Sequence, residues 1–300
     1  MTPAYSVEAL VLTYPGQDRP AVDAVSFSIA EGEVFGLLGD NGAGKSTVVR
    51  QLVTLLRPTS GRVALFGVDI AADPGLVART VGYMPQSSAA LNRLTAAESV
   101  YFAAHLRGLS RRDARRERDE LLGLWGIDEV AGRSSARLSG GQRRLLQLAV
   151  AMAGRRPVLI LDEPTNDLDP VRRKHVWSVL RRRNAELGTT IVLVTHDAVE
   201  AEKAIQRVGI LRRGRFTAIG TPAELRRGIE GALRVELAFP PDDPPALPEG
   251  VTPRETGEGR WLLLLDNADA GALVARLDPA TTDIRLSSTT LEDLYLHYAA

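Results

Sequence analysis

Residues 39 to 46 read GDNGAGKS, which fits the pattern GxxxxGK[ST] of a phosphate-binding loop. The apolar run Val34–Leu38 comes directly before it and has the length of a strand. From Lys45 to Leu56 the apolar residues recur at helical spacing, so the pattern predicts a helix there. A strand, a glycine loop and a helix in this order are the context that the motif requires. The stretch therefore predicts an α/β fold that binds a nucleotide.

Each residue type in this loop has a chemical task. Glycines allow a tight path in which successive backbone N–H groups point at one anion, and the following helix adds its positive N-terminal end. The lysine would reach the β- and γ-phosphates of ATP, and the serine hydroxyl would bind Mg²⁺. We expect the nucleotide to be bound by Gly39, Asp40, Asn41, Gly42, Ala43, Gly44, Lys45, Ser46 and Thr47.

Two acidic residues follow a second apolar run, Val158–Leu161. A carboxylate at the end of a buried strand can hold Mg²⁺ directly or through water, a role we assign to Asp162. The chain turns at the strand end, so Glu163 can reach the same site and polarise the attacking water. His196 follows the predicted strand Thr190–Thr195, where an imidazole can hydrogen-bond the phosphoryl group or the water.

Composition narrows the class of protein. The 300 residues carry zero formal net charge and include no cysteine. This gives no electrostatic case for nucleic-acid binding, and it excludes a disulfide framework or a thiolate metal site. No segment reaches the roughly 20 apolar residues of a membrane-spanning helix. We therefore expect that this chain does not form a path across a membrane by itself.

Strands alternate with helices along most of the chain, which predicts a mostly parallel sheet covered by helices. Residues 95–150 look mainly helical, and the charged segment Arg111–Glu120 is interpreted as a solvated helix face without a site. Residues 240–245, rich in proline and aspartate, break regular structure. From residue 228 we predict a small α+β unit, with strands at 233–239, 260–265 and 283–286 and helices at 268–277 and 290–298.

A second glycine-rich stretch, residues 138 to 142, reads LSGGQ and leads into a helix predicted to end at Ala153. A helix N-terminus with small residues is another anion site. Because residues 39–46 already take the phosphates of one nucleotide, this second site would face the γ-phosphate of an ATP on an opposing copy. Together with the Asp-Glu-Pro strand end, these motifs resemble the nucleotide-binding domain of ATP-binding-cassette (ABC) transporters, over about residues 7–225.

The resemblance implies a P-loop NTPase fold with a RecA-like core, an antiparallel β subdomain and a helical subdomain at about residues 87–155. These parts would form an ABC nucleotide-binding domain of residues 1–227. The α+β unit of residues 228–300 would then be a separate C-terminal domain, and both a regulatory or dimer-stabilising role and a mere packing role stay open for it.

The resemblance also assigns residue roles. Tyr14 would stack on adenine, and His196 would be the switch histidine. Catalysis is expected from Glu163, His196 and Gln86, and the metal ligands are expected to be Ser46, Gln86 and Asp162. The ATP of an opposing copy is expected to contact Ser139, Gly140, Gly141, Gln142 and Asp169.

One residue departs from the family pattern. The interface segment, residues 166 to 169, reads Asn-Asp-Leu-Asp, with Asp167 where glycine or alanine is commoner. The added carboxylate could alter dimer affinity or be harmless. The other motif positions follow the pattern, so we expect active hydrolysis.

Residues 32–39, 94–99 and 290–296 look like the ATPases of type-2 drug exporters, the daunorubicin-resistance type. We therefore expect an ATPase that uses ATP and Mg²⁺, forms an ATP-sandwiched homodimer at the cytoplasmic face of the membrane, and drives separate permease subunits. The cargo would be a hydrophobic drug, antibiotic or metabolite, and no nucleic acid is expected as a partner. An importer ATPase and a non-transport ABC ATPase remain as alternatives.

Overall fold

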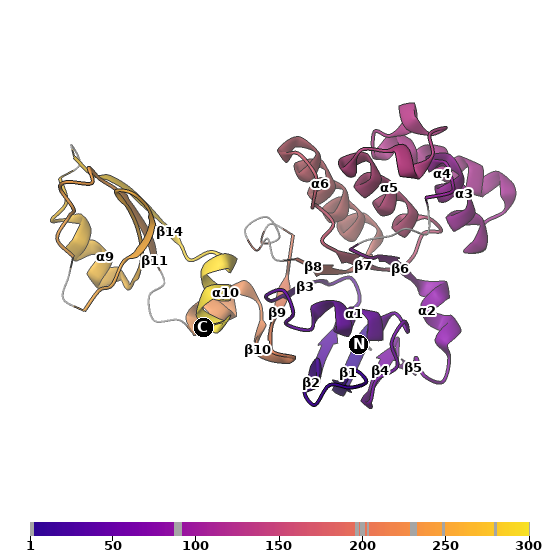
Figure 1. Ribbon diagram of the computed structural model, residues 1–300, viewed down its shortest axis with the longest axis horizontal. Coiled ribbons are helices and arrows are strands. Elements are labelled where there is room, and N and C mark those ends of the chain that lie inside the picture. The colour runs from indigo at the N-terminus through magenta and orange to yellow at the C-terminus, as the bar shows by residue number, and fades with distance from the viewer. Residues whose placement is uncertain are drawn as a thin grey trace. The chain divides into compact units, whose positions relative to one another are not determined.

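The computed structural model describes residues 3–86, 92–195, 198, 202, 204–228, 233–247, 250–278 and 281–299. The chain divides into two compact units, residues 1–219 and 220–300, which are taken separately below (Figure 1). The division comes before the expected start at residue 228, because helix α8 (Pro222–Arg227) packs with α10 (Leu291–Ala299) of the second unit.

Within the described residues, unit 1 has a four-stranded sheet in the order β2-β1-β4-β5 and a six-stranded sheet in the order β10-β9-β3-β8-β7-β6. The first sheet is antiparallel, whereas β9, β3, β8, β7 and β6 run parallel. The strands are β1 (Tyr5–Leu12), β2 (Val22–Ile29), β3 (Val34–Leu38), β4 (Ser60–Leu65), β5 (Val68–Asp69), β6 (Val81–Met84), β7 (Val158–Asp162), β8 (Thr190–Val194), β9 (Arg207–Arg212) and β10 (Arg215–Gly220).

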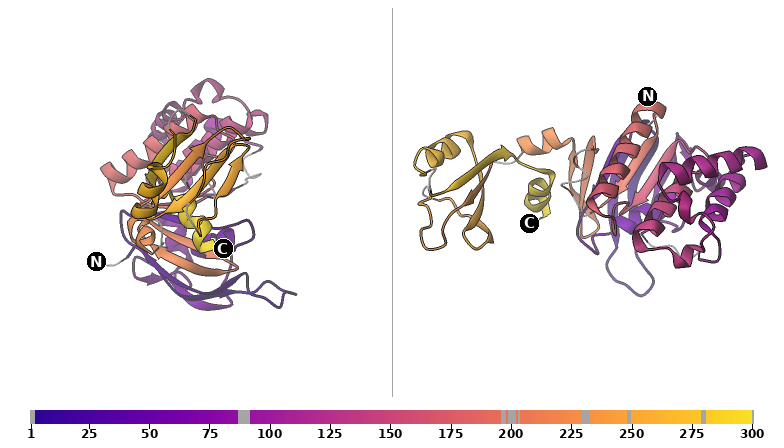
Figure 2. Two further views of the ribbon diagram at one scale, coloured as in Figure 1. Left: turned by 90° about the vertical axis from the view of Figure 1, so that its left-hand side faces the viewer. Right: turned by 90° about the horizontal axis from the view of Figure 1, so that it is seen from above.

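Helices cover both faces of the parallel sheet, as the alternation of elements predicted (Figures 1 and 2). The helices of unit 1 are α1 (Lys45–Leu52), α2 (Pro74–Thr80), α3 (Ala96–Leu106), α4 (Arg111–Leu124), α5 (Gly140–Met152) and α6 (Pro170–Leu187). The apolar side chains of α1 pack in one core with those of β1, β2 and β3. In the described part of the chain, no helix combines the length and the apolar character that crossing a membrane requires.

The central strands explain both the apolar runs and the position of the site. Every residue of β3, β7 and β8 is buried, because parallel strands between helices are shielded on both faces. All three strands run in the same direction, so their carboxyl ends meet at one edge of the sheet. Residues 39–46 follow β3 at that edge, and Asp162 ends β7 there.

Helix α1 is shorter than the sequence predicted. It ends at Leu52 rather than Leu56, because Thr54 adopts a left-handed φ of 59°. The backbone N–H groups of Leu55 and Leu56 both return to the carbonyl of Arg50 (2.8 and 3.0 Å), which closes the last turn. Periodicity alone could not show this end, since the apolar pattern continues past it.

Unit 2 has an antiparallel sheet in the order β12-β13-β11-β14, with α9 (Asn267–Val274) on one face (Figure 2). Its strands are β11 (Leu233–Ala238), β12 (Arg254–Gly257), β13 (Arg260–Leu265) and β14 (Asp283–Ser288). The sequence analysis missed β12, whose four residues are all exposed and lack apolar alternation.

The last helix packs on another helix. The spacing of Leu291, Leu294, Tyr295 and Tyr298 along one face could have placed α10 on its own sheet or on that of a partner. Instead α10 packs with α8, and the hydroxyl of Tyr298 donates to the carbonyl of Leu225 (3.1 Å). A short helix before the sheet supplies this surface, and periodicity does not reveal which surface a helix will meet.

Asp293 connects α10 to the sheet, which gives a test of unit 2. Its side chain is 1% exposed, with Oδ1 lying 2.7 Å from Nη1 of Arg234. Asp293→Ala should therefore destabilise unit 2 by about 3 kcal/mol, because it leaves a mostly buried arginine without this carboxylate. Amide hydrogen exchange over residues 233–238 of the full chain would measure the change. The exposed neighbour Glu292, replaced by Ala, is the control, and equal effects of the two variants would contradict this role.

Candidate nucleotide-binding and catalytic site

The loop of residues 39–46 is compatible only with glycine at two of its positions. Gly44 has a φ of 106°, and a Cβ there would collide with the carbonyl oxygen of Ala21. A Cβ at Gly39 would collide in the same way with the carbonyl oxygen of Leu211. The neighbouring strands therefore hold the loop in a fixed path at the start of α1.

Lys45 is buried and folds back over the loop. Its Nζ donates to the backbone carbonyls of Gly39 (2.5 Å) and Asp40 (2.9 Å). Burial lowers the pKa of Lys45, and the negative charges of Glu163, Asp162 and Asp40 oppose that shift. The ammonium is thus a cation held at the mouth of the loop, where phosphate oxygens can replace neutral carbonyls as stronger acceptors.

Ser46 and Asp162 come from different elements and meet at the same edge of the sheet. The Ser46 hydroxyl donates to Oδ2 of Asp162 (3.2 Å), whose side chain is buried at the end of β7. Burial raises the pKa of Asp162; the Ser46 hydrogen bond opposes this, and the nearby Glu163 charge adds to it. A hydroxyl and a carboxylate oxygen side by side are hard donors that suit Mg²⁺, which keeps phosphates and water as its other ligands.

Among the residues that the structure describes, no cluster of three or more His, Cys, Asp or Glu residues could hold an ion. The Ser46–Asp162 pair fits Mg²⁺ because its oxygens are hard donors, and a bound nucleotide would add phosphate oxygens.

Glu163 leaves the strand by an unusual backbone conformation. Its φ is 52°, a left-handed value that is uncommon outside glycine, and its N–H donates to the carbonyl of Val194 (2.8 Å). Oε2 of Glu163 accepts from the Thr195 hydroxyl (3.2 Å), and the side chain is buried. This left-handed conformation interrupts the regular strand, in which consecutive residues point to opposite faces. The strained conformation supports a role for this carboxylate in the site.

Two further residues that the sequence assigned to the site are Tyr14 and Gln86. The Tyr14 hydroxyl is 3.1 Å from Oγ1 of Thr47 in α1, so its ring lies next to the phosphate loop. The Gln86 side chain is exposed, and its backbone carbonyl accepts from Nη1 of Arg144 (3.1 Å). His196 falls outside the described residues.

The second glycine-rich stretch, residues 138–142, leads into the N-terminus of α5. Ser139 is the N-cap, and its hydroxyl accepts from the N–H of Gln142 (3.2 Å) while the Gln142 side chain accepts from the N–H of Ser139 (3.1 Å). Ser139 and Gly140 are exposed. The start of this helix is therefore accessible to an anion brought by another molecule.

Asp167, the departure from the family pattern, packs on this helix start. Its Oδ2 lies 3.7 Å from Nη2 of Arg144, and its Cβ lies 3.6 Å from where a Cβ of Gly140 would be. The carboxylate thus already faces a cation of its own chain. The adjoining Asp169 is the N-cap of α6: its Oδ1 accepts from the N–H of Arg172 (2.9 Å), a bond that lowers the pKa of Asp169.

Sequence reasoning missed Arg144 and Thr195. Arg144 is buried and connects α5 to Gln86 and Asp167, while the Thr195 hydroxyl donates to the Glu163 carboxylate. An arginine inside a helix and a threonine at a strand end fit no motif, so only their tertiary contacts identify them. Four features occur together in this structure: the glycine loop, the buried lysine, the Ser–Asp pair and the glutamate with a left-handed backbone. This combination defines the site of a phosphate-loop ATPase.

Comparisons with known proteins agree with this geometry. The family model described as ABC transporter matches residues 22–166. The daunorubicin/doxorubicin resistance ATP-binding protein DrrA of Streptomyces peucetius is 34% identical over 295 residues, covering 97% of this chain and 87% of DrrA. ATP-binding cassette sub-family A member 7 of Rattus norvegicus is also 34% identical over 97% of the chain, but the chain spans only 14% of that protein.

Solved structures of ABC transporter cassettes are also similar to this chain. One, described as the ATP-binding subunit of an ABC transporter, has a TM-score of 0.70 and 29% identity, covering 75% of this chain and 92% of that one. A cassette whose dimeric structure holds ADP and Pi has a TM-score of 0.68 and 26% identity, covering 72% and 98%. The chain belongs to the ABC transporter family, and it is an ATP-binding and ATP-hydrolysing protein of that family.

The contacts of Arg144 predict different outcomes for two substitutions. Asp167 has a left-handed φ of 63°, which an asparagine also tolerates. Asp167→Asn therefore removes only an exposed charge, and the free energy of unfolding should change by less than about 0.5 kcal/mol. Arg144→Met also frees the Gln86 carbonyl and should cost about 1–2 kcal/mol and lower turnover. Denaturant unfolding and a steady-state ATPase assay would measure both variants. Equal losses would show that the Asp167 carboxylate, rather than the carbonyl contact, positions Arg144.

Proposed function

We propose that the chain is the ATPase subunit of an exporter that moves a hydrophobic drug, antibiotic or metabolite through separate membrane subunits. The observation that carries the proposal is the match to DrrA, which extends over 97% of the chain and therefore through both units. DrrA is named for resistance to daunorubicin and doxorubicin. Phospholipid-transporting ATPase ABCA3 of Homo sapiens, 36% identical over 75% of this chain, adds a relative named for a lipid cargo, although the chain spans only 13% of it.

The geometry of the site supports one role in ATP hydrolysis for each of its residues. Lys45 would exchange the carbonyls of Gly39 and Asp40 for the β- and γ-phosphates. Ser46, Asp162 and Gln86 would hold Mg²⁺, which supplies neutralising charge to the phosphates. Glu163, oriented by Thr195, would accept a proton from the attacking water.

His196 and Tyr14 complete the proposed site. An imidazole at position 196 would hydrogen-bond the γ-phosphate, as the resemblance implies. The ring of Tyr14 would stack on adenine, which its position beside Thr47 in α1 supports.

A second copy would complete the site. Ser139, Gly140, Gly141 and Gln142 would bind the γ-phosphate of ATP held by the opposing copy, with Asp169 at the same interface. The exposure of the α5 N-terminus and the dimeric cassette bound to ADP and Pi support this arrangement. Because ATP binds the closed dimer better than separate copies, binding drives closure and hydrolysis allows opening.

An exposed apolar surface supports docking to membrane subunits. Phe102 and Leu106 lie one turn apart on α3, and Leu106 is 83% exposed. A cavity of about 320 Å³ lined by Val53, Leu55, Tyr83 and Arg107 adds further apolar surface. Exposed apolar groups rimmed by polar ones are typical of protein interfaces.

The dimer is tested with a variant that binds but does not hydrolyse. Glu163→Gln should bind ATP and accumulate as a dimer in gel filtration with light scattering, because the water is no longer deprotonated. Adding Ser139→Arg should leave ATP binding intact and abolish the dimer, since the bulky side chain occupies the γ-phosphate contact. Lys45→Ala, which removes the phosphate cation, is the control for loss of binding. A strictly monomeric Glu163→Gln variant in ATP, or one that turns over normally, would contradict the proposal.

Export is tested with a permease encoded beside this chain. In inside-out vesicles that carry both proteins, ATP should drive uptake of a hydrophobic drug. Leu106→Arg should lower uptake by about ten-fold while the ATPase rate of the free subunit stays unchanged, because the substitution adds a charge to the docking surface only. Arg111→Glu, on the charged helix α4, is the control. Uptake that is ATP-independent, or unaffected by Glu163→Gln, would overturn the export function.

A further inference from the structure

An aromatic pair lies at one end of the core of unit 2. The rings of Phe239 and Trp261 are 4.6 Å apart between centroids and meet edge to face at 68°. Both pack in the apolar cluster beneath α9, Phe239 as a buried member and Trp261 as a partly buried one. Since Trp261 is only partly covered, one side of the pair remains accessible.

A cavity of about 640 Å³ opens over this pair. Its lining includes Phe239, Trp261, Pro241, Pro244, Glu255 and Glu258. The volume falls within the range of small-molecule sites, roughly 300–1,000 Å³. Aromatic rings and prolines provide an apolar floor, and the two glutamates are the charged groups of the lining.

Backbone contacts fix the walls of the cavity. The N–H of Phe239 donates to the carbonyl of Gly259 (2.9 Å), which ties the end of β11 to the turn between β12 and β13. Gly259 has a φ of 64°, and a Cβ there would collide with the carbonyl oxygen of Phe239. Only glycine therefore allows this close approach, and the cavity is formed before any ligand arrives.

The strand register places a carboxylate beside the indole. Glu255 pairs directly with Trp261 across β12 and β13, so the two side chains share one face of the sheet. Neither Glu255 nor Glu258 has an ion-pair partner within the described ranges, and no arginine there lies over either ring. The cavity therefore combines uncompensated negative charge with open aromatic surface.

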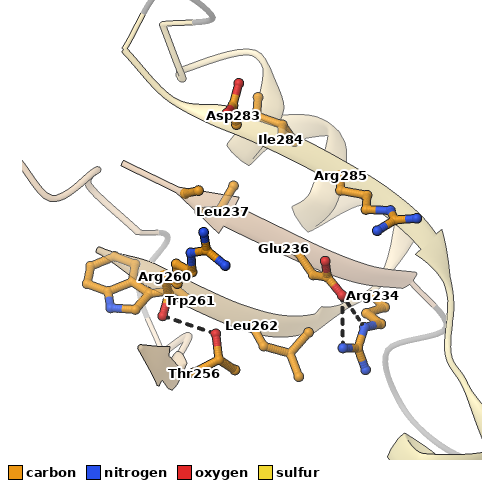
Figure 3. A pocket seen from close by; sticks show the side chains of 11 residues that line it. Arg234, Glu236, Leu237, Thr256, Arg260, Trp261, Leu262, Asp283, Ile284 and Arg285 are labelled. Atoms are coloured by element: carbon orange, nitrogen blue, oxygen red, sulfur yellow. Dashed lines mark hydrogen bonds and ion pairs between the residues drawn. The ribbon is translucent and has the colours of Figure 1, made fainter. Parts of the chain in front are cut away.

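The nearby arginines face the other side of the sheet. Arg254 pairs with Leu262, and Arg260 pairs with Ala238, both on the face opposite Trp261. Figure 3 shows a pocket whose lining includes Arg260 and Trp261, and where Nη2 of Arg234 makes an ion pair with Oε1 of Glu236 (2.9 Å). Alternation along β13 thus places Arg260 and Trp261 on different faces, although Cδ of Arg260 lies 3.9 Å from where a Cβ of Gly257, a residue of the cavity lining, would be.

We propose that this cavity binds an organic cation with an apolar body. A ring face attracts a cation through its quadrupole, and carboxylates beside the ring add Coulomb attraction. An anion of the same shape would gain the apolar contact but meet two like charges. The proposal concerns a site in unit 2 and does not depend on the ATPase chemistry or on the export function.

The test uses two rigid ions of the same shape, tetraphenylphosphonium and tetraphenylborate, with the full-length protein. The chain has three tryptophans, and Trp125 and Trp177 are buried in unit 1, so quenching by a bound ligand reports mainly on Trp261. Tetraphenylphosphonium should quench this fluorescence saturably. It should bind at least about ten-fold more tightly than tetraphenylborate, because the borate lacks the cation–π and carboxylate terms.

Matched variants locate the binding. Glu255→Gln should weaken phosphonium binding about three-fold, whereas Asp283→Asn, which removes one carboxylate from the opposite face, should have no effect. Trp261→Leu, followed by equilibrium dialysis because the reporter is lost, should weaken binding at least about five-fold. Circular dichroism of each variant checks that the sheet is intact.

Two results would overturn the proposal. Equal affinity for the two ions would show an apolar surface without charge selectivity. Phosphonium binding that persists unchanged in Trp261→Leu would place the ligand elsewhere on the protein. Loss of ATPase or transport activity in separate experiments would affect the proposed function and leave this outcome unchanged.

Discussion

The structure of unit 1 depends on the burial of three charged side chains at one edge of a parallel sheet. Lys45, Asp162 and Glu163 are all buried, where an unpaired charge is costly. Lys45 attracts both carboxylates, which repel each other, and fixed hydrogen bonds hold all three side chains. The interiors of β3, β7 and β8 can be apolar because helices cover both faces, so polar groups gather where the strands end. The fold therefore concentrates charge at the edge of the sheet that forms the candidate nucleotide site.

The second half of the proposed ATP contact is not buried in this way. The N-terminus of α5 is exposed. Its capping box satisfies the N–H groups of Ser139 and Gln142 with neutral side-chain oxygens, so the partial positive charge of the helix end is not neutralised by a charged side chain. Arg144 joins this helix to Gln86 and to the segment of Asp167, so parts that would serve two different nucleotides are in contact within one chain. A change at one site thereby has a physical route to the other.

Unit 2 differs from unit 1 because helix α9 lies on only one face of its antiparallel sheet. Its sheet has an apolar face beneath α9, and alternation along β13 places the consecutive residues Arg260 and Trp261 on different faces. The Arg234–Asp293 pair connects the sheet to α10, while α8 and α10 pack on each other. No motif marks the aromatic cavity, because its members come from the end of β11, the loop after it and the turn between β12 and β13.

The sequence by itself determined the α/β class, most of the strands and the residues of the phosphate loop, because a glycine pattern and fully apolar runs are local signals. Contiguous motifs also identified Asp162, Glu163 and the LSGGQ helix start. Only the tertiary structure decided where α1 ends, that α10 meets α8, that Glu163 adopts a left-handed backbone conformation, and that Arg144 and Thr195 contact residues of the candidate site. Those features arise from contacts between residues far apart in the chain, and side-chain spacing along one element carries no information about the surface that the element will meet.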